Sequence, residues 1–359
     1  MEAKEIIFMS KGEGENSFAQ NSSFTQRVAE LSKPALERTV QSLITEDFRT
    51  NKVLNVVDLG CSSSPTSFSV MSTVIQNVKN KCQELNFQIP EFQFYLNDLP
   101  GNDFNTLFKG LPKLSERFTD VSCFFTGVPG SFHGRLFPSN SLHLVHSSYG
   151  VHWLSKMPRL RDEAGLPLNK GKIYISTTSP AAVKEAYLTH FKEDLSLFLK
   201  SRSQEMVRNG RVFFVIPGRP SADQFPIRES LYPWEPLAQS ISSLVSEGVI
   251  EEEKLDAFDI PYYTPSQQEV RETVEKEGSF TMELLDKFVI EIGDENTWEN
   301  VEKLSKNIRA FTESMISHHF GEEILDKLYD KFTQLSIQDS ATSEQPYKII
   351  SFIIVLRRN

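Results

Sequence analysis

The chain has 359 residues, which is enough for one large α/β domain with insertions or for two domains. A composition of 39% hydrophobic and 24% charged residues is typical of a globular protein in water, and a formal net charge of −10 argues against a nucleic-acid partner. Three irregularly spaced cysteines give neither a disulfide framework nor a zinc signature. With no signal-peptide pattern and no apolar run long enough to span a bilayer, we expect a cytoplasmic protein without membrane contact.

The N-terminal part of the chain is polar before it becomes helical. Residues 10–22 predict either a flexible arm or an ordered flap that turns Phe18, Asn21 and Ser22 toward a ligand. Apolar side chains at helical spacing then predict a helix over residues 25–45.

The stretch Val53–Val70 combines an apolar, β-branched run, a turn at Gly60 and a second apolar pattern at helical spacing. This order predicts a strand, a tight turn and a helix, as at the start of nucleotide-binding α/β units. Backbone N–H groups at such a turn can face an anionic group. The G-x-G-x-x-G fingerprint is absent, with Ser62 and Ser64 where small residues are wanted, so the turn alone leaves a binding role and a purely structural role open.

Three further buried strands are predicted after this unit, over residues 92–96, 121–127 and 142–146. Ligands of open α/β sheets bind beyond the carboxyl ends of parallel strands, so Asp58, Asp98, Ser131 and Tyr149 would share one edge if these strands are parallel. Asp98 follows Gly60 by 38 residues (98 − 60), whereas a dinucleotide fingerprint expects about 20, which disfavours a plain NAD site.

The α/β alternation continues through a helix over residues 180–208 and a strand over residues 210–216. Residues 217–268 are rich in proline and aromatic residues and predict an insertion that caps the sheet edge. Within and after this insertion we expect helices over residues 234–248, 265–277 and 297–332, and strands over residues 280–290 and 347–356. No catalytic triad or H-E-x-x-H motif is present, and His152, at the predicted ligand edge, is the histidine retained as a candidate.

Seven blocks of sequence match one family in order: GENSFAQNS, VVDLGCSSSP, LNDLPGNDFNTLF, GVPGSFHGRLFP, LHLVHSSYGVHWLS, FDIPYYTPS with EGSF, and HFGEEILDKLY. The chain resembles the plant SABATH methyltransferases, which methylate small carboxylic acids such as salicylate, benzoate and jasmonate, or the ring nitrogens of xanthines. The resemblance implies an α/β class I methyltransferase fold, a Rossmann-like sheet with helices on both faces and an α-helical cap. It also implies S-adenosylmethionine as methyl donor, a homodimer, and a single domain over residues 1–359 with cap insertions at roughly 150–170, 217–280 and 297–320.

Residues carried over by motif position define a donor site in this resemblance: Phe18, Ser22, Asp58, Gly60, Cys61, Thr66, Asp98, Leu99, Ser131 and Phe132. Phe18 stands where the family commonly has tyrosine, so an aromatic contact is kept and a hydroxyl is lost. Asp98 can accept both ribose hydroxyls, Leu99 and Phe132 can sandwich the adenine, and Asp58 would lie near the ammonium end of the donor.

The resemblance also implies an acceptor pocket, with Tyr149, His152, Trp153 and Gln26 as catalytic candidates. Its walls would add Thr25, Trp234, Tyr263, Ile308 and Phe311. Some family members carry a magnesium site at the positions of Asn169, Asp256, Phe258 and Asp259. Carboxylate and amide oxygens suit a hard cation, and a pair of surface loops without metal is the alternative.

Three positions depart from the family pattern. Ser64 replaces a usual glycine, which is costly if the backbone there needs a positive φ, and Thr66 replaces a common asparagine. The family's acceptor-binding glutamine aligns with Thr25, whereas Gln26 lies about 100° further around the helix.

These observations favour a carboxyl O-methyltransferase that makes methyl esters of a small aromatic or apolar carboxylic acid. An acceptor carboxylate is already ionised at pH 7, so alignment for in-line displacement would suffice without a general base. Two alternatives stay open: N-methylation of a xanthine-like heterocycle, favoured by Thr25, and a donor-binding protein with little activity, favoured by Ser64 and Thr66.

Overall fold

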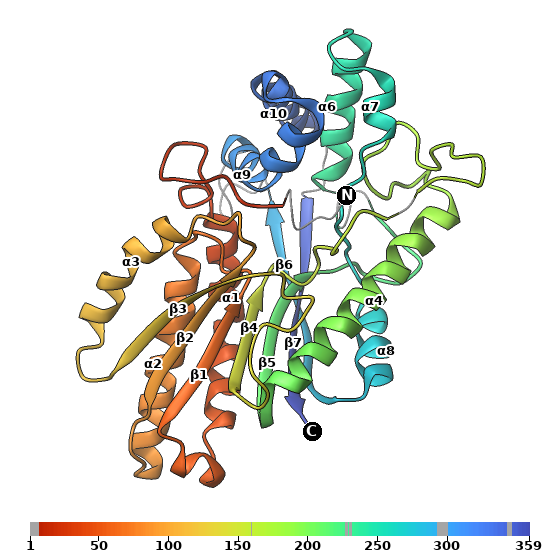
Figure 1. The fold of residues 1–359 in the computed structure, drawn as a ribbon. Coiled ribbons are helices and arrows are strands. Elements are labelled where there is room, and N and C mark those ends of the chain that lie inside the picture. Colours follow the sequence, from red (N-terminus) through yellow and green to blue (C-terminus); the bar gives the residue numbers. More distant parts are fainter. Residues whose placement is uncertain (1–6, 159, 227–228, 230–231, 293–300, 343–346) are drawn as a thin grey trace.

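A computed structural model describes residues 7–158, 160–226, 229, 232–292, 301–342 and 347–359. Among them a seven-stranded sheet has the order β3-β2-β1-β4-β5-β7-β6 (Figure 1). Its strands are β1 (Val53–Leu59), β2 (Glu91–Asp98), β3 (Cys123–Pro129), β4 (Leu142–Ser148), β5 (Met206–Pro217), β6 (Phe280–Ile292) and β7 (Tyr347–Arg358). Strands β1 to β5 pair in parallel, whereas β7 runs antiparallel to both β5 and β6.

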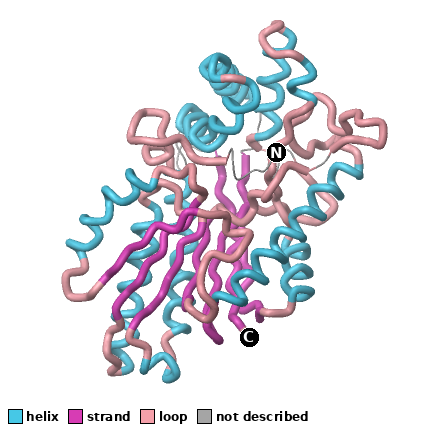
Figure 2. Tube along the Cα trace, viewed as in Figure 1, coloured by secondary structure: helices cyan, strands magenta, loops and turns pink. Residues whose placement is uncertain are grey.

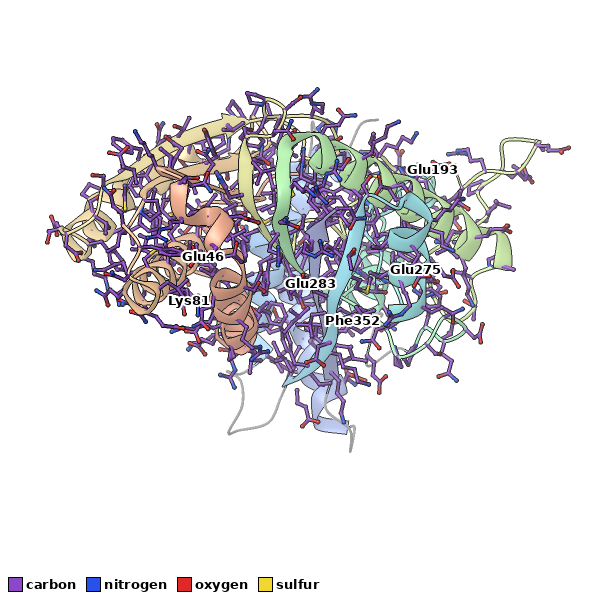
Figure 3. All side chains as sticks on the ribbon, turned by 90° about the horizontal axis from the view of Figure 1, so that it is seen from below. Glu46, Lys81, Glu193, Glu275, Glu283 and Phe352 are labelled. Atoms are coloured by element: carbon purple, nitrogen blue, oxygen red, sulfur yellow. The ribbon has the colours of Figure 1, made fainter. Side chains whose placement is uncertain are left out.

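Helices cover both faces of the sheet and one of its ends (Figure 2). One face is covered by α1 (Ser23–Leu43), α2 (Thr66–Leu85) and α3 (Phe104–Arg117), and the other by α4 (Ala181–Glu205) and α8 (Gln267–Glu277). Beyond the sheet end lie α6 (Trp234–Ser246), α7 (Glu252–Asp256), α9 (Val301–Phe320) and α10 (Leu325–Thr342). Two 3₁₀ turns complete the described elements, η2 (Glu46–Thr50) and η3 (Glu322–Ile324). Seen from the opposite end, Lys81 on α2 and Glu193 on α4 lie on the two sides of the sheet (Figure 3).

Two hydrophobic cores lie on the two faces because successive side chains of a strand point in opposite directions. In β5, Val212 and Phe214 belong to the core under α4 and α8, whereas Phe213 and Val215 belong to the core under α1 and α2. A strand buried on both faces reads as a continuous apolar run, which is why residues 210–216 were recognisable in the sequence.

The predicted sheet and the parallel arrangement of its first strands are confirmed. Asp103 caps α3, since its side chain accepts a hydrogen bond from the backbone N–H of Thr106. The single helix expected over residues 297–332 is instead two helices, because α9 ends at Phe320 and Gly321 has a φ of 103°. Residues 297–300 of that prediction lie outside the described residues.

No helix in the described ranges is long and apolar enough to cross a membrane. The division into one domain with three cap insertions stays a prediction.

The two-sided core predicts where a truncation is costly. Phe213 is fully buried in β5, so Phe213→Ala should lower the free energy of unfolding by about 3–5 kcal/mol. Phe124 on the edge strand β3 is 51% exposed, and Phe124→Ala should change it by less than about 0.5 kcal/mol. Urea unfolding measures both, and equal losses from the two variants would contradict this account of the core.

Candidate active site

The carboxyl ends of four parallel strands meet at one cavity of about 460 Å³. Asp58 comes from β1, Asp98 from β2, Ser131 from the segment after β3 and Tyr149 from the segment after β4, and all four line this cavity. The convergence expected from the strand order is therefore present, because parallel strands place their carboxyl ends at one edge.

The turn after β1 is held by the end of β2. The backbone N–H groups of Gly60 and Cys61 both donate to the carbonyl oxygen of Asn97, at 2.9 and 3.0 Å. Gly60 has a φ of 77° and Ser62 a φ of 49°. The positive φ considered for Ser64 is therefore found at Ser62 instead. A residue with a side chain adopts this backbone conformation less readily than glycine does.

Asp98 is fixed by two backbone donors. One carboxylate oxygen accepts from the N–H of Ser62 and the other from the N–H of Leu99, each at 2.7 Å. Burial raises the pKa of Asp98 to about 6, although these two hydrogen bonds act in the opposite direction. A fixed, ionisable carboxylate of this kind can accept hydroxyl hydrogen bonds from a ligand.

Asp58 already has two side-chain partners within the protein. His146 Nδ1 lies 2.7 Å from Asp58 Oδ1, and Ser67 Oγ donates to Asp58 Oδ2 at 2.5 Å. A carboxylate offers about four acceptor positions, so Asp58 keeps capacity for a cationic group in the cavity.

The residues that depart from the family pattern form a chain of hydroxyl groups. Ser64 Oγ lies 2.8 Å from Thr66 Oγ1, which lies 3.3 Å from Thr25 Oγ1, and all three residues line the cavity. Gln26 is outside the cavity, since its Nε2 donates to Ser22 Oγ at 3.2 Å. The one-residue shift along α1 therefore exchanges an amide for a hydroxyl at the cavity wall.

Aromatic side chains enclose the other end of the cavity. Trp153 contacts Tyr262 and Phe311, with ring centroids at 5.3 and 6.2 Å, and His152 contacts Tyr262 at 4.7 Å. Tyr149 has a φ of 56°, and its hydroxyl lies 2.8 Å from Ser351 Oγ on β7. This end can hold a flat ring against apolar faces.

His152 is a neutral side chain in this enclosure. It is 1% exposed, and burial lowers its pKa to about 3. Within the described part of the chain, neither His152 Nδ1 nor Ser148 Oγ has a hydrogen-bond partner, and both residues line the cavity. Buried polar atoms left unpaired are costly, so these two atoms are suited to contact a polar ligand.

Most of the site residues expected from the sequence lie together at the cavity, namely Phe18, Thr25, Asp58, Gly60, Cys61, Thr66, Asp98, Leu99, Ser131, Phe132, Tyr149, His152, Trp153, Ile308 and Phe311. Ser22, Gln26 and Trp234 do not line the cavity. Trp234 packs against the cavity residue Trp153, with 6.4 Å between the ring centroids.

Tyr262 takes the place at the wall that was assigned to Tyr263. Tyr262 forms an antiparallel bridge with Trp153, and the next residue in an extended segment points to the other side. Phe24, His146, Ser148 and Asn307 also line the cavity, and sequence reasoning did not assign them. Of these residues, His146 had the clearest signal in the sequence, because it lies at the end of a predicted strand in the block LHLVHSSYGVHW.

The four residues considered for magnesium do not form an evident cation site. Asn169 Oδ1 accepts from Ser179 Oγ at 2.7 Å, and Asp256 Oδ1 accepts a backbone N–H at 2.8 Å. The side chain of Phe258 has no ligand atom, and burial raises the pKa of Asp259 to about 7. No group of three or more His, Cys, Asp or Glu residues able to hold a metal occurs in the described ranges.

Comparison with known proteins assigns the class and then the family. A solved loganic acid methyltransferase with SAH superposes with a TM-score of 0.89 at 33% identity, covering 98% of both chains. The fold is that of a class I methyltransferase, as the resemblance implied, and a family model described as SAM dependent carboxyl methyltransferase matches residues 4–359. The chain belongs to this family and is a SAM-dependent methyltransferase.

Relatives about half identical to the chain are named for xanthine methylation. A probable 7-methylxanthine methyltransferase of Theobroma cacao is 50% identical, covering 100% of this chain and 98% of the relative. A 3,7-dimethylxanthine N-methyltransferase of Camellia sinensis var. assamica is 52% identical, covering 99% and 96%. The main functional prediction, a carboxyl O-methyltransferase, is therefore wrong. That prediction was based on the family members that methylate carboxylic acids, although Thr25 favoured the alternative, N-methylation of a xanthine-like heterocycle.

The raised pKa of Asp98 predicts how donor affinity changes with pH. The folded pKa of about 6 lies above the ordinary 3.8, so ionisation of Asp98 costs folded stability as pH rises through this interval. If the ionised carboxylate binds ribose hydroxyls, S-adenosylhomocysteine should bind about tenfold more weakly near pH 5 than near pH 7.5. Calorimetry measures this, and Asp98→Asn should bind more weakly but with little pH dependence. A wild-type affinity that does not change with pH would count against the role of Asp98.

Proposed function

We propose that this protein transfers a methyl group from S-adenosylmethionine to a ring nitrogen of a xanthine, such as 7-methylxanthine or a dimethylxanthine. The observation that carries the proposal is the acceptor end of the cavity, where Thr25 lines the wall, Gln26 is turned toward Ser22, and the rings of Trp153 and Tyr262 line the same cavity. The names of the relatives that are about half identical over their full length support it.

For the donor half we propose contacts that follow from the strand ends. Asp98 would accept the ribose hydroxyls, and the adenine would lie between Leu99 and Phe132, both of which line the cavity. Asp58, held by His146 and Ser67, would face the ammonium group of the donor. Its two remaining acceptor positions suit a cation, because a charge-assisted hydrogen bond is about twice as strong as a neutral one.

For the acceptor half we propose that the xanthine ring packs between Trp153, Tyr262 and Phe311. A xanthine carries ring carbonyl and N–H groups, and His152 Nδ1 and Ser148 Oγ are buried polar atoms without partners in the described residues. In one tautomer His152 Nδ1 accepts from a ring N–H, and in the other it donates to a ring carbonyl. Either contact removes the cost of leaving the atom unpaired.

The reaction differs from ester formation in its proton balance. S-adenosylmethionine supplies an electrophilic methyl group on a sulfonium. The ring nitrogen attacks in line, the S–CH₃ bond breaks, and the electron pair stays on sulfur while the N–H proton leaves. With a pKa of about 3, His152 is neutral at pH 7, so it can orient the N–H but does not retain the proton, which ends in the bulk solvent.

The substrate class can be tested directly. Purified protein with methyl-labelled donor and 7-methylxanthine should give a product one methyl group heavier, with the methyl on nitrogen by NMR. Benzoate, salicylate and jasmonate in parallel assays should give little or no methyl ester. Esters from the acid panel, with no N-methyl product, would refute the proposal.

Tyr262 offers a test of the acceptor wall. Tyr262→Ala should raise the KM for 7-methylxanthine about tenfold, because it removes a ring that packs against both His152 and Trp153. The affinity for S-adenosylhomocysteine should stay within about twofold of wild type, and Tyr262→Phe, which keeps the ring, should act as the matched control. An equal loss of affinity for S-adenosylhomocysteine would contradict the assignment of Tyr262 to the acceptor wall.

Homodimerisation and a cytoplasmic location stay predictions. Magnesium has no part in the proposed chemistry.

A further inference from the structure

Two arginine–glutamate pairs are buried beside the cavity without lining it. The side chains of Arg202 and Glu205 are both 0% exposed, and those of Arg219 and Glu269 are 1% and 5% exposed. Removing two charges from water carries a large desolvation cost, which the pair recovers only when further hydrogen bonds satisfy its remaining donors and acceptors. The partners that satisfy each pair are therefore informative.

The first pair holds the segment that follows β3. Arg202 Nε donates to Glu205 at 2.7 Å, and its two terminal nitrogens donate to the carbonyl oxygens of Phe132 and Gly134, both at 2.8 Å. Glu205 Oε1 accepts from the backbone N–H groups of Leu136 and Phe137, at 2.5 and 3.0 Å. The two side chains thus bind four successive points of one loop to the end of α4.

The same loop is held at its other end by β2. Asn97 Nδ2 donates to the carbonyl oxygens of Val128 and Gly130, at 2.7 and 2.9 Å. Ser131, which lines the cavity, lies between the two attachments, and Phe132, which also lines it, is the first residue that Arg202 holds. Phe132 also packs against the turn after β1, since a Cβ added at Gly60 would lie 3.7 Å from its ring.

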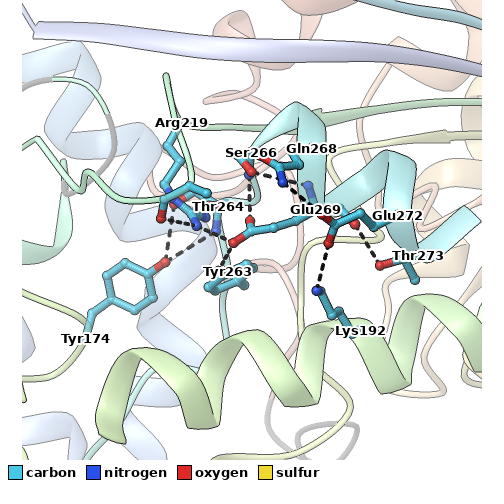
Figure 4. Close-up of polar contacts among 11 residues, drawn as sticks. Tyr174, Lys192, Arg219, Tyr263, Thr264, Ser266, Gln268, Glu269, Glu272 and Thr273 are labelled. Atoms are coloured by element: carbon cyan, nitrogen blue, oxygen red, sulfur yellow. Dashed lines mark hydrogen bonds and ion pairs between the residues drawn. The ribbon is translucent and has the colours of Figure 1, made fainter. Parts of the chain in front are cut away.

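The second pair is hydrogen-bonded to the segment from Tyr263 to Ser266 (Figure 4). Arg219 Nη1 donates to the carbonyl oxygen of Thr264, and Nη2 donates to Glu269 Oε1 at 2.5 Å. Glu269 also accepts from the Tyr263 hydroxyl at 3.2 Å and from the Ser266 N–H at 2.8 Å. The backbone N–H of Arg219 donates to the carbonyl oxygen of Pro265 at 2.9 Å, so the segment that follows Tyr262 is fixed from several sides.

The segment held by the second pair carries an acceptor wall. Tyr262 and Thr264 line the cavity, and so does Gly218, the residue before Arg219. The N–H of Tyr263 donates to the carbonyl oxygen of His152 at 3.0 Å, which ties the segment to the aromatic enclosure. Arg219 itself stacks over aromatic rings behind the wall, at 5.2 Å from the Tyr263 centroid.

From this division we infer that Arg202–Glu205 and Arg219–Glu269 are two separate positioning pairs, the first for the donor half of the cavity and the second for the acceptor half. The inference rests on the proposed donor and acceptor sites. Neither pair lines the cavity, and each acts through hydrogen bonds to the loop that carries the contact residues, mainly to its backbone carbonyl and N–H groups. Because the two pairs hold different loops, their effects on the two ligands are separable.

The experiment compares Arg202→Lys with Arg219→Lys. Lysine keeps the charge beside the glutamate, but a single ammonium cannot span the separate carbonyl oxygens that a guanidinium reaches. Arg202→Lys should weaken S-adenosylhomocysteine binding about tenfold by calorimetry and change the KM for 7-methylxanthine by less than about threefold. Arg219→Lys should do the reverse. Donor affinity needs no turnover, so this half of the comparison stands even if 7-methylxanthine is not the acceptor.

Each variant serves as the structural control for the other, because both disturb a buried ion pair. If one variant fails to fold, Arg202→Gln/Glu205→Gln and Arg219→Gln/Glu269→Gln remove both charges of a pair and keep at each position an amide that can hydrogen-bond the loop. Equal effects of both variants on both ligands, or no effect of either, would overturn the inference. Phe132→Ala and Tyr262→Ala report on the proposed sites themselves: if these variants bind donor and acceptor normally, the site assignment is at fault rather than the positioning role.

Discussion

The dipeptide Asn97-Asp98 at the end of β2 joins the loops on which the cavity depends. The Asn97 carbonyl accepts from the turn after β1, and its amide donates to the segment after β3. Asp98 adds hydrogen bonds from Ser62 and Leu99. A parallel sheet leaves backbone groups unpaired where its strands end, and buried groups of this kind must find partners. Here the side chains of Asn97 and Asp98, together with the Asn97 carbonyl, supply them, and the donor turn takes its shape as a result.

The sheet could be predicted from the sequence because its strands are short apolar runs that end in polar residues. Asp58, Asp98 and Tyr149 could also be placed at one edge of the sheet, because parallel strands have their carboxyl ends at the same edge. Finer placements depended on tertiary contacts. Tyr262 and Tyr263 are chemically alike, and only the bridge to Trp153 decides which of the two faces the cavity. Likewise, the non-glycine residue with positive φ in the donor turn is Ser62, two residues before the Ser64 that the family comparison suggested, and its N–H is bonded to Asp98 on β2.

The substrate class was harder to predict than the fold because it depends on a few side chains within a shared architecture. A carboxylate and a ring nitrogen can both attack the same methyl group from the same direction, so the aromatic enclosure suits either. What differs from the family pattern is the residue on α1 that we propose as the acceptor anchor, Thr25, which joins a chain of hydroxyls with Thr66 and Ser64. The exchange of one amide for one hydroxyl changes which polar atoms an acceptor can satisfy, while the enclosing rings stay in place.

The walls of the cavity come from unequal parts of the chain. Most of the residues proposed for the donor lie between Asp58 and Phe132, whereas the acceptor end collects side chains from Thr25, Trp153, Tyr262, Phe311 and Ile350. Scattered residues can be exchanged one at a time without disturbing a contiguous block. An ancestral enzyme of this architecture could thus acquire new acceptors by successive single substitutions while it retained its methyl donor. One family can in this way include catalysts for acids and for alkaloids.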